Sequence, residues 1–142
     1  MPRSAITMVA DASVVVGWLA DEPAAARVEA ALRRSLTGGG IVVPAHFPVE
    51  VANALLAGER RGRWGSDQSR EWLAILSRLR VTVEPPPDPV SLAAIAAKAR
   101  DLGLSVYDAA YIELARRLRL PIMTFDRSLN HAADQEGVDT IE

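Results

Sequence analysis

Short apolar runs alternate with longer stretches of helical spacing along this chain. Four of the runs are rich in β-branched residues and bounded by Gly or Pro, which is typical of buried strands in a parallel sheet. The predicted strands are residues 6–10, 40–43, 81–84 and 121–124, with 138–141 as a weaker fifth candidate.

Between the predicted strands, apolar residues recur every three or four positions, which predicts amphipathic helices. The four series are Ala24, Val28, Leu32 and Leu36; Trp72, Leu76 and Leu79; Leu92, Ile95, Ala99 and Leu102; and Tyr107, Tyr111, Leu114 and Leu118. This alternation predicts an α/β fold, a three-layer α/β/α sandwich with a central parallel sheet of four to five strands. The Gly-rich residues 38–40 and Pro-rich residues 85–87 mark turns between elements and not domain linkers, so we expect residues 1–142 to form a single domain.

Composition narrows the class of protein. The chain has 142 residues, 49% of them hydrophobic, which suits one domain with a substantial core. It has no Cys, which excludes disulfide frameworks and Cys-ligated zinc. Its net charge of −2 gives no bulk attraction for phosphate, although all but one of the basic residues are Arg. Since Asp11 interrupts the apolar sequence near the start and no apolar run is long enough to cross a bilayer, we expect a cytoplasmic protein with no membrane association.

The start of the patterned sequence lies at Met8, after seven residues without a pattern. Met8 is therefore a second candidate for the start codon beside Met1. In that case residues 1–7 form a disordered extension of the domain.

Four acidic residues fall at one edge of the predicted sheet. Asp11 directly follows the first strand, and Asp126 lies two residues beyond Thr124 at the end of the fourth. Glu50 stands in the first turn of the helix after the second strand, and Asp108 opens the helix that precedes the fourth strand. Ligands of open parallel sheets bind beyond the carboxyl ends of the strands, so we expect these four side chains to converge on one rim.

Each acid also has a purely structural interpretation. Asp11 and Asp126 are placed to cap the helices that follow them, and the sequence from Ser105 to Asp108 matches a capping box. Glu50 gains from the helix dipole wherever it occupies a first turn. The joint placement of the four acids at one edge is what favours a shared site.

Convergence of carboxylates predicts a cation. Two carboxylates about 6 Å apart repel by roughly 3 kcal/mol at an effective dielectric constant near 20, and such repulsion is relieved by raised pKa values or by a bound ion. An all-oxygen ligand set favours Mg²⁺, or Mn²⁺, over zinc, and the ion reverses the local field so that an acidic protein accepts a phosphate. The predicted chemistry is metal-assisted phosphodiester hydrolysis, and it requires Asp11, Glu50 and Asp108 to lie within reach of one ion.

The segments that carry the four acids resemble, in order, the motifs of PIN domains. They are Met8-Val-Ala-Asp11-Ala-Ser13-Val, Pro48-Val-Glu50-Val-Ala-Asn53-Ala-Leu, Ser105-Val-Tyr-Asp108-Ala-Ala-Tyr-Ile-Glu-Leu-Ala and Thr124-Phe-Asp126-Arg-Ser-Leu. Within that group the chain looks like the VapC toxins of prokaryotic type II toxin–antitoxin modules, and the resemblance runs from about Val9 to Val138.

This resemblance implies a PIN-like fold and an Mg²⁺-dependent endoribonuclease that hydrolyses RNA phosphodiester bonds with a metal-activated water. A cognate VapB-type antitoxin would hold the activity in check, and family members commonly form homodimers. The acidic quartet of the family falls on Asp11, Glu50, Asp108 and Asp126. Family members bind the metal most directly through the first and third acids, here Asp11 and Asp108.

The remaining roles are hypotheses from placement. Glu50 would orient or deprotonate the attacking water, and Asp126 would support a metal-bound water or a second ion. Ser13 and Thr124 place hydroxyl groups beside the acids, and Asn53 lies one helical turn after Glu50, where it could orient that carboxylate.

The densest basic cluster comprises Arg60, Arg61 and Arg63, with Trp64 beside it. Guanidinium and indole faces stack on bases, so these residues are candidates for RNA contact, with a solvated helix end as the alternative. The other aromatic residues, Trp18, Trp72, Tyr107 and Tyr111, are assigned to the core or a dimer interface, and His46 and His131 are interpreted as polar loop residues.

Two other functions fit parts of the pattern. A signalling receiver domain shares the fold class, but it requires paired acids after the first strand and a late Lys, whereas this chain has Asp11 alone and places Lys98 inside a helix. A catalytically silent PIN-like module that binds RNA or a protein is the stronger alternative. The RNA target, whether tRNA, rRNA or mRNA, cannot be predicted from these motifs.

Overall fold

The computed structural model describes residues 6–141, and its centre is a four-stranded parallel sheet in the order β3-β2-β1-β4. In register, Met8 lies opposite Ile41, and Ile41 opposite Val81. On the other side of β1, Val9 lies opposite Ile122. The strands are β1 (Met8–Ala10), β2 (Ile41–Val43), β3 (Val81–Val83) and β4 (Ile122–Met123).

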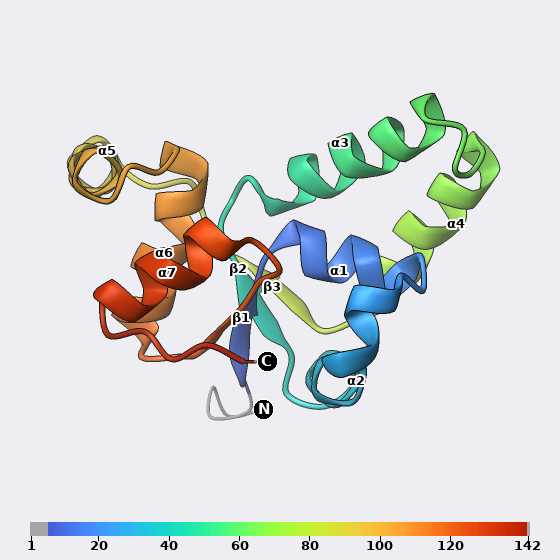
Figure 1. The fold of residues 1–142 in the computed structure, drawn as a ribbon, viewed down its shortest axis with the longest axis horizontal. Helices are drawn as coiled ribbons and strands as arrows, with labels where there is room; N and C mark the ends of the chain where they lie inside the picture. Colours follow the sequence, from blue (N-terminus) through green and yellow to red (C-terminus); the bar gives the residue numbers. More distant parts are fainter. Residues whose placement is uncertain (1–5, 142) are drawn as a thin grey trace.

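Helices cover both sides of this sheet, which confirms the predicted three-layer α/β/α class. Figure 1 shows α1, α2, α3 and α4 on one side of the sheet and α5, α6 and α7 on the other. The helices are α1 (Ala12–Leu19), the 3₁₀ helix η2 (Pro23–Arg27), α2 (Glu29–Thr37), α3 (Phe47–Arg60), α4 (Ser66–Leu76), α5 (Pro89–Leu102), α6 (Val106–Leu118) and α7 (Arg127–Gln135).

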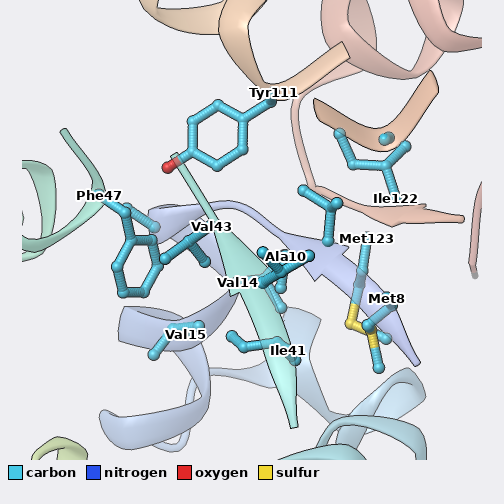
Figure 2. Packing of buried hydrophobic residues seen from close by; sticks show 14 of the residues in the cluster. Met8, Ala10, Val14, Val15, Ile41, Val43, Phe47, Tyr111, Ile122 and Met123 are labelled. Atoms are coloured by element: carbon cyan, nitrogen blue, oxygen red, sulfur yellow. The ribbon is translucent and has the colours of Figure 1, made fainter. Parts of the chain in front are cut away.

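The two central strands lie in the core. Every residue of β1 and β2 is buried, because helices cover both faces of the sheet at this point. The core is completed by large side chains from the helices, among them Phe47 at the start of α3 and Tyr111 in α6, each 1% exposed. Figure 2 shows both side chains in the same cluster, close to Val43 of β2.

The third strand differs from its prediction as a buried strand. β3 is half-exposed, and Val83 is 45% accessible. It is one of the two edge strands of the sheet and, unlike β4 at the other edge, its short run is not covered as the central strands are. An uninterrupted run of β-branched residues predicts a strand but does not distinguish the centre of a sheet from its edge.

Three further predictions are corrected by the structure. The helix predicted from Ala24 to Leu36 is divided at Val28 into η2 and α2. The weak fifth strand is reduced to one parallel bridge between Ile122 and Thr140. Tyr107, assigned to the core or a dimer interface, is not part of the core, since it is 63% exposed in this chain, and its place in an interface stays a prediction.

The predicted disordered extension, residues 1–7, lies mostly outside the described residues. Within the described part, Thr7 is attached to the domain. Its backbone N–H donates to the Gly40 carbonyl at 3.1 Å, and its hydroxyl donates to Ser35 Oγ at 2.6 Å. In residues 6–141, none of the helices combines the length and apolar content needed to cross a membrane.

A tryptophan closes the turn between α3 and α4. The indole of Trp64 donates to the Leu55 carbonyl at 3.0 Å and meets the Trp72 ring edge-on, with 4.9 Å between the ring centroids. Its benzene ring lies against Gly58, so close that a Cβ at this position would be 2.0 Å from Trp64 Cζ2. Glycine at position 58 therefore sets the approach of α4 to α3.

We predict that Gly58→Ala destabilises the domain by at least about 2 kcal/mol, because the added methyl group displaces the Trp64 ring and breaks its hydrogen bond. Urea unfolding followed by tryptophan fluorescence measures the loss. Gly65→Ala is the matched control, since a Cβ there meets nothing within 4 Å, and it should cost less than about 1 kcal/mol. Equal effects of the two substitutions would contradict this packing account.

Candidate active site

Asp11 is a buried carboxylate at the end of the central strand β1, with only 8% of the residue exposed. One oxygen, Oδ1, accepts from the backbone N–H of Val14 at 3.1 Å, which caps α1, and from Ser13 Oγ at 2.6 Å. The other oxygen accepts a short hydrogen bond from Thr124 Oγ1, just beyond β4. The helix cap suggested by the sequence is present, and both predicted hydroxyl groups contact the carboxylate.

Thr124 connects Asp11 to the fourth acid. Its Oγ1 also accepts from the backbone N–H of Asp126 at 3.1 Å, and its carbonyl accepts from Asn130 Nδ2 at 3.1 Å. Asp126 is exposed and caps α7 by accepting from the N–H of Ser128 at 2.8 Å. The ends of β1 and β4 thus form one hydrogen-bonded unit that carries two of the four acids.

Glu50 is held by a hydrogen bond from Tyr111 and lies beside His46, whose Nε2 makes no hydrogen bond of its own within residues 6–141. The sequence did not single out either residue for this site. Tyr111 Oη donates to Glu50 Oε1 at 2.8 Å, and His46 Nε2 lies 3.2 Å from the same oxygen. The imidazole is packed edge-on between Tyr107 and Tyr111, with ring centroids 5.3 and 5.4 Å away. Asn53, which we expected to orient Glu50, lies in an exposed position on α3.

A local signal existed for each of these residues. His46 precedes Glu50 by four positions, a spacing that places two side chains on one helix face. Tyr111 follows Asp108 by three positions on α6, so it belongs near the same end of that helix. Neither spacing predicts that Tyr111 of α6 reaches α3, because that contact depends on the packing of the two helices.

Asp108 lies in the first turn of α6 and is half-buried. Its backbone N–H donates to Ser105 Oγ at 3.1 Å, so the predicted cap of this helix is present. Burial raises the pKa of the Asp108 carboxyl, and the neighbouring carboxylates of Asp126 and Glu50 raise it further.

The same electrostatic field acts on Asp11. Burial raises the pKa of its carboxyl, the hydrogen bonds from Ser13, Thr124 and Val14 partly oppose the shift, and the Glu50 carboxylate adds to it. Burial and the Glu50 carboxylate also raise the pKa of the Tyr111 phenol, which therefore stays a hydrogen-bond donor. Glu50 is thus electrostatically coupled to both Asp11 and Asp108, and Asp108 to Asp126.

These negative charges have little local compensation. In residues 6–141 the ion pairs of Arg and Lys involve other acids, and the single contact of this kind at the four site acids is that of His46 with Glu50. A buried carboxylate without a cationic partner is costly. The arrangement therefore favours a positively charged ligand.

The acids do not form a closed ligand set. No group of three or more His, Asp or Glu side chains in the described part of the chain gathers closely enough to hold a metal ion. Our expectation that Asp11, Glu50 and Asp108 lie within reach of one ion is therefore wrong for this structure. Each carboxylate is directed to its own donor, Asp11 to Ser13 and Thr124 and Glu50 to Tyr111, and mutual repulsion opposes closer approach.

The donor chemistry nevertheless fits a hard divalent cation. All four side chains supply carboxylate oxygens, the ligands that Mg²⁺ and Mn²⁺ prefer. Their charges are coupled and lack Arg or Lys partners within residues 6–141. A divalent ion bound among them would offset the repulsion between their charges.

Comparison with known proteins identifies the family. The model of the PIN domain family matches residues 8–135. The chain belongs to the PIN domain family. PIN domains are generally nucleases, and they typically use a divalent metal.

A solved structure shares this PIN fold. The crystal structure of PAE2754 from Pyrobaculum aerophilum superposes with a TM-score of 0.70 at 24% sequence identity, covering 95% of this chain and 83% of that chain. At this identity the likeness concerns the fold. Among curated proteins, no match to the chain was found.

The basic cluster is partly engaged in structural contacts. Arg63 pairs with Glu22 at 2.6 Å, and its guanidinium lies 4.8 Å from the centre of the Trp64 ring. Arg60 ends α3 and Arg61 caps it, and both are exposed. RNA contact by these residues stays a prediction. Arg60 and Arg61 are better placed than Arg63 to reach a ligand, because Arg63 is engaged with Glu22 and Trp64.

We predict that Asp11→Asn raises the stability of the PIN domain at pH 7 in EDTA by on the order of 1 kcal/mol. The native state binds the Asp11 proton more tightly than the unfolded state does, so the stability that protonation confers is complete below the ordinary pKa of 3.8 and is lost as pH rises through the raised value. Asn at this position carries no charge, so it avoids this loss of stability. Its side-chain oxygen still accepts hydrogen bonds from the Val14 N–H and the Ser13 hydroxyl. Urea unfolding at pH 3.5 and 7 measures the difference.

Asp101→Asn, at an exposed position of α5, is the matched control and should change stability by less than about 0.5 kcal/mol at either pH. The gain from Asp11→Asn should shrink toward pH 3.5. A variant that is less stable than the wild type at pH 7 would show that the carboxylate is not electrostatically strained.

Proposed function

We propose that this PIN domain is an Mg²⁺-dependent endoribonuclease and the toxin of a VapBC-type toxin–antitoxin module. The observation that carries the proposal is the placement of four acids from separate segments around one set of contacts, without Arg or Lys partners within residues 6–141. Thr124 Oγ1 donates to the Asp11 carboxylate and accepts from the Asp126 backbone N–H. Tyr111, one turn after Asp108 on α6, donates to Glu50. The match of residues 8–135 to the PIN family supports a nuclease. The toxin assignment is supported by the resemblance of the four motifs to VapC sequences.

In this proposal, Asp11 and Asp108 hold the ion, with Asp126 as support. When bound there, Mg²⁺ or Mn²⁺ would lower the pKa of a coordinated water and would offset the negative charge that develops on the phosphate. Glu50 orients the attacking water and accepts its proton. Thr124 and Ser13 fix the Asp11 carboxylate through their hydroxyl groups.

Tyr111 positions Glu50, and the His46 imidazole packs beside the same carboxylate without a hydrogen bond to it. The phenol donates to Oε1 at 2.8 Å and the imidazole stands 3.2 Å from the same oxygen, so one side of the carboxylate is held and the other oxygen is left for water. A fixed carboxylate lowers the entropic cost of reaching the reactive geometry. The partners proposed with this function are an RNA substrate, a VapB-type antitoxin and a second copy of the chain, and the proposed location is the cytoplasm.

A catalytically silent module is the second candidate, and a specific observation favours it. Asp11 and Asp126 cap helices, and Asp108 stands in a capped first turn, so local structure alone accounts for three of the acids. Helix capping does not explain why Asp11 is buried without a basic partner among the described residues and within the field of the Glu50 carboxylate.

We predict that Asp11→Asn and Asp108→Asn each reduce Mg²⁺-dependent cleavage of total RNA by at least about 100-fold, because each removes a charged ligand of the ion. Gel analysis of RNA fragments measures the rate, with EDTA abolishing cleavage and excess Mg²⁺ restoring it. Asp101→Asn is the control of equal charge change and should cleave at the wild-type rate. A wild-type protein that shows no metal-dependent cleavage would favour the silent module.

We predict that Tyr111→Phe lowers kcat about tenfold with little change in KM, because the ring still fills the core while the Glu50 carboxylate loses its donor. Steady-state cleavage of a short RNA measures both constants. Ile112→Leu, a buried substitution on the same helix that does not touch the site, controls for packing. An unchanged kcat in Tyr111→Phe would show that the Tyr111 hydroxyl does not position Glu50.

A further inference from the structure

A cleft of about 280 Å³ adjoins the acidic site on the side of His46. Its walls come from the segment after β2, the segment after β3 and the faces of α5 and α6 that meet there. Apolar surface is supplied by Pro44, Pro86, Ile95 and Leu114. Its volume falls just below the usual range of about 300–1,000 Å³ for small-molecule pockets, which suits a single heterocycle.

Tyr107 lies next to this cleft, against its His46 wall. It directly precedes Asp108, and its ring meets the His46 imidazole edge-on at 5.3 Å. Ala110 and Leu114, which line the cleft, follow it at spacings of three and seven on α6, so the three residues share a helix face. Tyr107 is 63% exposed, so its side chain is open to a ligand.

The polar groups of the cleft suit a base better than a phosphate. Arg117 donates to one oxygen of Glu84 and one oxygen of Glu113, each at 2.8 Å, so its own charge is matched by two carboxylates. The second oxygen of each carboxylate stays available as an acceptor. Carboxylates repel phosphate, but they accept hydrogen bonds from the amino groups of nucleobases.

We propose that Tyr107 and this cleft form a subsite for an unpaired nucleobase of RNA, next to the phosphate that is cleaved. The choice of RNA as occupant rests on the proposed nuclease function. The base stacks on the exposed Tyr107 ring, and Glu113 accepts from its amino group. The subsite therefore favours cytosine, which has an exocyclic amino group, over uracil, which has none.

Fluorescence anisotropy of labelled C₆ and U₆ RNA tests the subsite, with Ca²⁺ in place of Mg²⁺ and gel analysis to check that the RNA stays intact. The charge of the ion is then present while binding is measured without cleavage. We expect the wild-type protein to bind C₆ more tightly than U₆. Tyr107→Ala should weaken binding of C₆ at least tenfold, and Tyr107→Phe, which keeps the stacking ring, should stay within twofold. Glu113→Gln should abolish the preference for C₆. Leu118→Ala, at the far end of α6, is the exposed control and should bind as the wild type does.

Wild-type binding of C₆ by Tyr107→Ala would overturn the subsite and indicate that the exposed ring contacts a protein partner. A wild-type protein that binds neither oligonucleotide would overturn it as well. The nuclease proposal is judged separately, by cleavage in Mg²⁺. Tyr107-dependent binding without any cleavage would support the nucleobase subsite and reject the nuclease.

Discussion

The buried Asp11 carboxylate is the interaction on which the rest of the site depends. It ends the central strand of the sheet, caps α1 and accepts a hydrogen bond from Thr124 beyond β4, so it joins two parallel strands at their carboxyl ends. Such a group is costly to bury, because its charged form loses hydration without a cationic partner. The fold retains it together with Glu50, whose negative charge makes the burial less favourable still. This conflict between stability and charge is typical of a functional site.

Local signals predicted much of the fold and the positions of the acids. Runs of β-branched residues located β1 and β2 to within two residues, and helix-start signals located the caps at Asp11, Ser105 and Asp126. These features depend on neighbours in sequence, so they are readable from it. The exposure of β3 could not be predicted in this way, because it depends on the position of the strand in the sheet and not on its neighbours in sequence.

The geometry between segments could not be predicted in the same way. The hydrogen bond from Tyr111 to Glu50 joins residues 61 positions apart and depends on how α3 and α6 pack. The prediction of a tight acidic cluster was wrong for a related reason. Placement of the acids at one edge of the sheet does not determine the direction in which each carboxylate points. Ser13 and Thr124 each donate a hydrogen bond to an oxygen of Asp11, and Tyr111 donates one to Glu50, so the direction of each carboxylate is set by its own donor. The sequence motifs therefore predict that the acids lie at the same edge of the sheet. They do not predict whether the carboxylates come close enough to surround an ion.

The central claim is that a divalent cation joins Asp11 and Asp108. A crystal of the wild-type protein soaked in Mn²⁺ tests it most directly, through the anomalous scattering of the ion. The account predicts one strong anomalous peak within about 2.5 Å of a carboxylate oxygen of each residue, and no such peak in crystals of Asp11→Asn. Ordered carboxylates with no peak between them, at a Mn²⁺ concentration that supports cleavage in solution, would contradict the account.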